Sequence, residues 1–163
     1  MFPHIFPRWI VACMLVAGCD HGGGAGAVDP TGRTIAITIS GNGRSHEFTV
    51  ERAVTEAEQA RGLMFRASIP EDGGMLFWPY PAGGGPGRDA NFWMKNTPSA
   101  LDIVFIRADG TIARIAVQTI PFSEEPVRSD EPVTAVLELR GGRTAALGIA
   151  EGDRATWLGQ AAQ

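Results

Sequence analysis

The segment at residues 101–106, with the sequence LDIVFI, constrains the fold more than any other part of the chain. Side chains alternate between the two faces of a β-strand, and here both faces are apolar except at Asp102. Such a strand must be covered on both sides, so it is predicted at the centre of a sheet. A carboxylate buried there is costly without partners, so Asp102 requires either a cation or several amide donors.

The rest of the chain predicts short strands separated by turns. Alternating or apolar runs predict strands at residues 34–40, 44–53, 75–78, 91–94, 111–117, 133–139 and 154–158. Short helices are expected at residues 55–62, which begin with a capping-box pattern, and at residues 143–147. Prolines and glycines crowd residues 79–90, so no regular structure is expected there. The predicted fold is α+β and mainly β: a compact antiparallel sheet or partly closed barrel with two short helices.

Residue counts exclude several kinds of site. Both cysteines, Cys13 and Cys19, lie near the N-terminus, so the expected domain has no thiol for a disulfide, a nucleophile or a metal site. Only His46 of the three histidines falls within it, which excludes sites that need two imidazoles. No metal and no cofactor is therefore predicted. The net charge of −4 argues against nucleic acid as a partner, because that role needs a basic face.

The N-terminal segment predicts export and lipidation. Arg8 precedes an apolar stretch at residues 9–17, which suits a secretory signal and is too short to span a bilayer. Val-Ala-Gly before Cys19 resembles the lipobox of bacterial lipoproteins; the alternative is an ordinary signal peptide with a chance cysteine. We expect a signal peptide at residues 1–18, a lipidated Gly-rich tether at residues 19–32 and one domain at residues 33–163.

Asp20, the residue after the lipobox, indicates which membrane is expected to hold the chain. Asp20 resembles the signal for inner-membrane retention in enteric bacteria. The expected location is therefore the bacterial cell envelope, as a periplasm-facing lipoprotein held to the membrane by lipid on Cys19, with the inner membrane favoured.

A second carboxylate on an apolar strand is Glu138, in the sequence VLEL at residues 136–139. Strand alternation puts it on the face of Val136, away from Leu137 and Leu139. Lys95, the single lysine, and Arg61 and Arg66 are the cationic side chains that could approach Asp102 or Glu138. Two interpretations stay open: ion pairs that fix the strand register, or a ligand-binding or catalytic cleft.

Several spaced motifs carry a family resemblance. They are RGLMFR at residues 61–66, GMLF at 74–77, FWMKNT at 92–97, LDIVF at 101–105, VLEL at 136–139, GI at 148–149 and GD at 152–153. Together they resemble the family called domain of unknown function 192, over residues 48–157. The resemblance implies a compact, β-rich, barrel-like domain that is often exported, and it implies no established activity. Residues 79–90 are longer than is usual in the family, and Ala100 replaces a frequent proline before Asp102.

Three functions stay open on this evidence. The first is a membrane-tethered periplasmic module that binds a small polar ligand or an envelope glycan. The candidate ligand-binding residues are Arg61, Arg66, Trp93, Lys95, Asn96, Asp102 and Glu138. The second is a protein interaction or assembly factor that uses a methionine and aromatic surface. The third is a hydrolase-like or lyase-like enzyme with Lys95 as a base beside a carboxylate; no nucleophile, metal set or cofactor motif supports it, so a non-enzymatic role is preferred.

Overall fold

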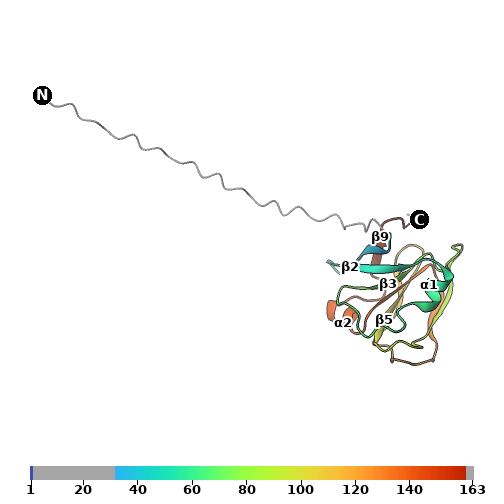
Figure 1. Ribbon diagram of the computed structural model, residues 1–163. Helices are drawn as coiled ribbons and strands as arrows, with labels where there is room; N and C mark the ends of the chain where they lie inside the picture. Colours follow the sequence, from blue (N-terminus) through green and yellow to red (C-terminus); the bar gives the residue numbers. More distant parts are fainter. Residues whose placement is uncertain (2–31, 161–163) are drawn as a thin grey trace.

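The computed structural model describes Met1 and residues 32–160 (Figure 1). The predicted signal peptide, Cys19 and nearly all of the predicted tether lie outside these residues. In chain order the elements are β1 (Thr34–Gly41), β2 (Arg44–Ala53), α1 (Glu56–Arg61), β3 (Gly74–Phe77), β4 (Arg88–Phe92), β5 (Leu101–Ile106), β6 (Ile112–Ala116), β7 (Val127–Val133), β8 (Ala135–Arg140), α2 (Arg143–Leu147) and β9 (Arg154–Trp157). None of the helices within the described residues is long and apolar enough to cross a membrane.

The strands form one large sheet and one small one. Seven strands follow the order β6-β5-β8-β3-β2-β1-β9, while β4 and β7 pair with each other. Neighbours are antiparallel except β2 and β3, which are parallel. An isolated bridge between Thr111 and Arg154 joins the two edges of the large sheet. The sheet therefore curls into a partly closed barrel, which confirms the predicted fold class.

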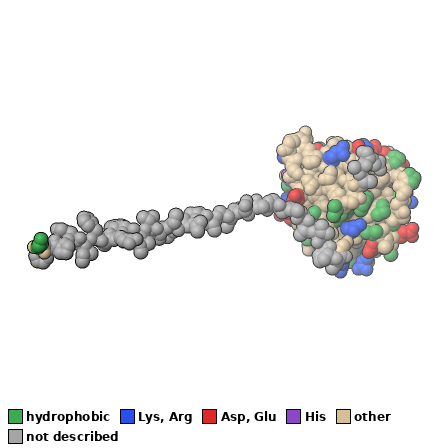
Figure 2. Space-filling view, turned by 90° about the horizontal axis from the view of Figure 1, so that it is seen from above, with side chains coloured by type: hydrophobic (Ala, Val, Ile, Leu, Met, Phe, Trp, Pro, Cys, Tyr) green, Lys and Arg blue, Asp and Glu red, His purple; other side chains and the backbone are tan. Residues whose placement is uncertain are grey.

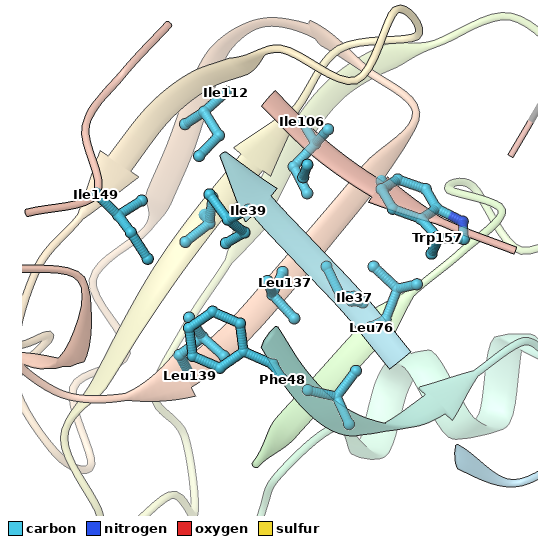
Figure 3. Packing of buried hydrophobic residues seen from close by; sticks show 14 residues of the cluster. Ile37, Ile39, Phe48, Leu76, Ile106, Ile112, Leu137, Leu139, Ile149 and Trp157 are labelled. Atoms are coloured by element: carbon cyan, nitrogen blue, oxygen red, sulfur yellow. The ribbon is translucent and has the colours of Figure 1, made fainter. Parts of the chain in front are cut away.

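Apolar side chains are buried on both faces of the curled sheet. The cluster inside the curl draws on all seven of its strands, and Figure 3 shows its side chains converging. Its largest members are Ile37, Ile39, Phe48, Leu76, Ile106, Ile112, Leu137 and Trp157. A second cluster covers the outer face, where Met75, Phe77, Ile103, Phe105 and Val136 meet Ala90 of β4 and Val133 of β7. β5 is buried along its whole length, as its sequence predicts.

Two parts of the chain differ from the sequence-based expectation. β4 begins at Arg88, inside the segment where no regular structure was expected, because it pairs with β7 across Asn91 and Arg128. The expected strand at residues 133–139 spans parts of two strands, β7 and β8, which are separated at Thr134. Most of β7 was not predicted. β7 carries charges and Pro132, and its only buried residues are Ser129 and Val133. A strand in a two-stranded sheet tolerates such a sequence because one edge needs no ladder partner.

Candidate functional site

Asp102 is completely buried in β5, on the side of the sheet where α2 begins. Its Oδ1 accepts hydrogen bonds from the backbone amides of Gln118 and Gly142, both at 2.8 Å. Its Oδ2 accepts from the Thr144 amide at 2.9 Å and the Thr144 hydroxyl at 2.6 Å. Backbone amides and one hydroxyl therefore supply the partners that the buried carboxylate requires, and Asp102 fixes the start of α2 against β5.

Glu138 is 4% exposed and lies on the opposite, outer face of the sheet. It shares that face with Val136, as strand alternation predicts, between Met75 of β3 and Ile103 of β5. Its Oε2 is buried and has no hydrogen-bond partner among residues 32–160. Burial raises the pKa of Glu138 to about 8, and the backbone amide of Leu63 lowers it by less. Glu138 is therefore mostly protonated at neutral pH.

A cleft of about 400 Å³ lies over Glu138. Its walls come from α1 and the turn after it, from Phe77 of β3, from the segment after β3, and from β4 with Trp93. Gly62 has φ of 49° and ψ of −136° and borders the carboxyl group. A Cβ at Gly62 would lie 3.1 Å from Phe77 Cζ and 3.6 Å from Glu138 Oε2. The absent side chain leaves space beside that oxygen.

Two arginines line the cleft, one from α1 and one from β4. Arg61 comes from the last turn of α1, and Arg88 opens β4 with its guanidinium 5.3 Å from the ring centre of Tyr80. Within the described residues, neither arginine forms an ion pair. Glu56 is the second carboxylate of the lining, so two cations face one exposed anion and the mostly protonated Glu138. The cleft is thus basic in a chain whose net charge is −4.

The walls of the cleft are held in place by hydrogen bonds. Gln59 Nε2 donates to the carbonyl oxygens of Pro79 at 2.8 Å and Ala53 at 3.1 Å, which ties α1 to the segment after β3. The Tyr80 amide donates to the carbonyl of Thr134 at 2.9 Å. Phe92 packs edge-on against Phe77, with ring centres 5.0 Å apart. The cleft is therefore preformed and partly aromatic.

The structure brings only some of the predicted site residues together. Arg61, Trp93 and Glu138 line the cleft. Arg66, Lys95, Asn96 and Asp102 do not. Arg66 makes two 2.8 Å bonds to Glu51 at the surface. The amide of Phe65 donates to the carbonyl of Asn96, whose φ of 55° places it in a turn.

The expected pairing of Lys95 with Asp102 or Glu138 is wrong. Lys95 Nζ lies 3.6 Å from Glu124 Oε1 and 5.1 Å from the ring centre of Trp93. The expectation of one cleft containing both carboxylates is also wrong. It failed because Asp102 and Glu138 face opposite sides of the sheet, one meeting the amides around α2 and the other meeting the cleft.

Sequence reasoning missed other residues of the cleft, chiefly Gln59, Gly62, Tyr80, Arg88 and Asn91. Gly62 lies inside the RGLMFR motif and could have been singled out there. Arg88 and Tyr80 carry no local signal, because their approach depends on the path of residues 79–87 and on the pairing of β4 with β7. Among residues 32–160, no cluster of three or more His, Cys, Asp or Glu side chains could hold a metal ion.

Comparisons with known proteins agree with this architecture. The model of domain of unknown function 192, a family described as "Uncharacterized ACR", matches residues 37–157. A crystal structure of a protein of unknown function from Novosphingobium aromaticivorans is 41% identical, with a TM-score of 0.72 over 80% of this chain and 91% of that one. A crystal structure of a candidate transcription regulator from Sinorhizobium meliloti is 40% identical, with a TM-score of 0.71 over 76% and 93% of the two chains. No curated protein matches the chain.

Proposed function

The chain belongs to the family domain of unknown function 192, which is uncharacterised, and from its cleft we propose that it is a binding module for a small polar ligand. One observation carries the proposal: a buried carboxyl group with an unpartnered oxygen lies at a preformed cleft. An unsatisfied buried polar atom costs about 1–3 kcal/mol. A ligand that bonds to Glu138 Oε2 would remove that cost, and Arg61 and Arg88 of the lining offer it a second attachment.

We propose further that this module is a lipoprotein of the bacterial cell envelope, facing the periplasm. The support is the lipobox ending at Cys19 together with the Gly-rich segment at residues 20–32. Asp20 favours the inner membrane. In that setting the ligand is a periplasmic solute or a component of the envelope, such as a glycan fragment.

Untargeted mass spectrometry of small molecules that co-purify with the full chain tests ligand binding. We expect one or more compounds to be retained by the wild type and by the control Glu125→Gln, an exposed carboxylate outside the cleft. The double variant Arg61→Met/Arg88→Met should lose them. If no compound is retained, and if no compound of a metabolite library raises the melting temperature of the wild type more than that of the double variant, the proposal is wrong.

Two other roles receive less support from the geometry. An enzymatic role for Lys95 is not proposed, because Lys95 does not line the cleft. A role in DNA binding is not proposed either, although one similar structure is described as a candidate transcription regulator. The chain is acidic overall, and acidic and basic side chains are interspersed on the face seen in Figure 2.

Interaction with a protein partner is the second candidate function, and a specific observation favours it. Phe65 and Phe122 are 67% and 63% exposed and both have positive φ, of 65° and 61°. Their backbone amides donate to the carbonyls of Asn96 and Thr97, at 2.7 and 3.1 Å, so they flank one turn. The double variant Phe65→Ser/Phe122→Ser tests this role: it should keep any co-purifying compound but fail to complement a deletion strain. Full complementation would remove this candidate.

A further inference from the structure

The charged groups around the cleft indicate the chemistry of its ligand. α1 contributes Glu56 and Arg61, β4 contributes Arg88, and β8 contributes Glu138. β3 contributes only Phe77, and the segment after it contributes the phenol of Tyr80. The groups that carry full charge at neutral pH are therefore two arginines and one glutamate, because Glu138 is mostly protonated.

We infer, on the basis of the proposed binding function, that the ligand is a monoanionic carboxylate with an apolar body, held by Arg61 and Arg88 and by a hydrogen bond that Glu138 donates. A guanidinium presents two parallel N–H groups that match the two oxygens of a carboxylate. The hydroxyl of protonated Glu138 donates to a carboxylate oxygen in a charge-assisted hydrogen bond. The ligand thereby satisfies the buried oxygen that has no partner among the residues that the structure describes.

The apolar body and the single charge follow from the rest of the lining. Phe77, Tyr80, Phe92 and Trp93 give the cleft an aromatic wall, which suits a ring or a short aliphatic chain. The two arginines and Glu56 give the lining a net charge of +1, so a dianion such as a phosphate monoester would leave one negative charge uncompensated. A cationic ligand would meet two arginines and a carboxyl group that is mostly uncharged.

Proton binding by Glu138 predicts the direction in which the affinity for the ligand changes with pH. Burial sets the pKa of Glu138 at about 8 in the free protein, and a bound anion beside it would raise that pKa further. Above pH 8 the free protein loses the proton that the complex retains, so the affinity for an anion falls as pH rises. A cationic ligand would show the opposite trend, because it favours the ionised carboxylate.

The experiment is a calorimetric titration of the purified full chain with four probes of one shape: benzoate, benzamide, benzylamine and phenyl phosphate. We expect benzoate to bind at least tenfold more tightly than any of the others at pH 6.5. Between pH 6.5 and pH 9.5 its affinity should fall roughly 30-fold, the change that a group with a pKa of about 8 produces when the complex keeps the proton.

Variants connect the binding to the named residues. Arg61→Met and Arg88→Met should each weaken benzoate binding about tenfold, and both side chains are exposed enough for the fold to persist. The matched control Arg128→Met, an exposed arginine outside the cleft, should bind as the wild type does. Glu138→Gln keeps the size of the side chain and a hydrogen-bond donor, so it should bind benzoate with little dependence on pH.

The outcomes separate this inference from the proposed binding function. If benzylamine or benzamide binds as well as benzoate, or if the affinity for benzoate rises with pH, the cleft is a binding site for another class of ligand and the inference is wrong. Tighter binding of phenyl phosphate also overturns it, in favour of a dianion. If none of the four probes binds and no compound co-purifies with the chain, both the inference and the proposed function are wrong.

Discussion

Asp102 and Glu138 lie on adjacent strands of one sheet and face opposite sides of it. Asp102 is paired with Leu139 across the β5–β8 ladder, and Ile103 is paired with Glu138, so the two carboxyl groups are one residue out of register. Asp102 receives hydrogen bonds from three backbone amides and a hydroxyl. Glu138 Oε2 receives none from the described part of the chain and borders a cleft. Asp102 therefore has its hydrogen-bond partners within the fold, whereas Glu138 keeps an oxygen without a described partner at the cleft.

Replacing Asp102 tests its structural role. Asp102→Ala removes the acceptor of the Gln118, Gly142 and Thr144 amides, the last of which is buried, and we expect it to lower the free energy of unfolding by about 3–5 kcal/mol. Asp89→Ala, at an exposed aspartate, should change it by less than about 0.5 kcal/mol. Urea unfolding of both variants measures the difference. An Asp102→Ala protein as stable as the wild type would mean that this carboxylate is not buried among those donors.

The raised pKa of Glu138 predicts how stability depends on pH. In the unfolded chain this carboxyl group ionises near its ordinary value of 4.5, whereas in the folded protein it keeps its proton up to about pH 8. Between these values the folded state binds more protons, so this group lowers the free energy of unfolding by about 1.4 kcal/mol per pH unit as pH rises. The contribution is complete below pH 4.5 and is lost by about pH 8.

Glu138→Gln removes this dependence. Between pH 5 and pH 8, the free energy of unfolding of the variant should therefore rise relative to that of the wild type by roughly 4 kcal/mol. Urea unfolding at several pH values measures it, with Glu125→Gln as an exposed control that should follow the wild type. Curves for Glu138→Gln and the wild type that remain parallel across this range would show that Glu138 ionises normally in the folded protein.

Local sequence patterns were sufficient for the fold class, but they missed most of β7 and predicted only part of the site. The capping box of Thr55 and Glu58 forms as predicted, with the Thr55 amide 2.8 Å from Glu58 Oε2. The burial of β5 on both sides and the position of Glu138 on the same face as Val136 follow from the two-residue period of a strand. These features depend on neighbours in sequence, which is why they could be predicted.

The site depends on contacts between distant segments, and these carry no local pattern. Arg88 reaches the cleft only because β4 pairs with β7. The charged sequence of β7 is not typical of a strand, so this pairing could not be predicted. Strand alternation places Glu138 on the outer face of the sheet and Asp102 on the inner face. This relation between the two residues can be derived only when the register of β5 with β8 is known. Lys95 turns toward Glu124, which lies 29 positions along the chain in a segment with no predicted element.

Lys95 is expected to contribute little to stability. Its ion pair with Glu124 joins side chains that are 42% and 63% exposed, so Lys95→Met should lower the free energy of unfolding by about 1 kcal/mol or less. Lys95→Arg should behave similarly. Thermal melts of both variants test this. A loss of several kcal/mol in Lys95→Met alone would instead indicate that Lys95 neutralises a buried carboxylate.

Lipidation of Cys19 remains a prediction from the sequence, at a position outside the described residues. Cys19→Ser should move the protein from the membrane fraction to the soluble fraction, or leave an unprocessed precursor, because the thiol that accepts lipid is absent. Cys13→Ser, inside the predicted signal peptide, is the matched control and should leave the protein in the membrane. Intact-mass analysis that shows an unmodified N-terminus after Ala17 or Gly18 would contradict the prediction.

Backbone strain at the exposed phenylalanines gives a last test, in which removing a large side chain should stabilise the protein. A residue with a Cβ in the left-handed region costs about 1–2 kcal/mol, which exceeds the 0.5–1 kcal/mol cost of fixing a glycine. Phe65→Gly and Phe122→Gly should therefore each raise the free energy of unfolding by about 0.5–1 kcal/mol.

The control for both variants is Val117→Gly. Val117 is an apolar residue, 57% exposed, that is absent from the positions of positive φ, so its replacement should lower the free energy of unfolding by about 0.5–1 kcal/mol. Urea unfolding distinguishes the opposite signs. If all three variants lose stability equally, the phenylalanine rings stabilise the fold through their own contacts. A gain at Phe65 and Phe122 would mean that the chain carries strain to present two aromatic side chains beside the Asn96 turn, as an interaction surface requires.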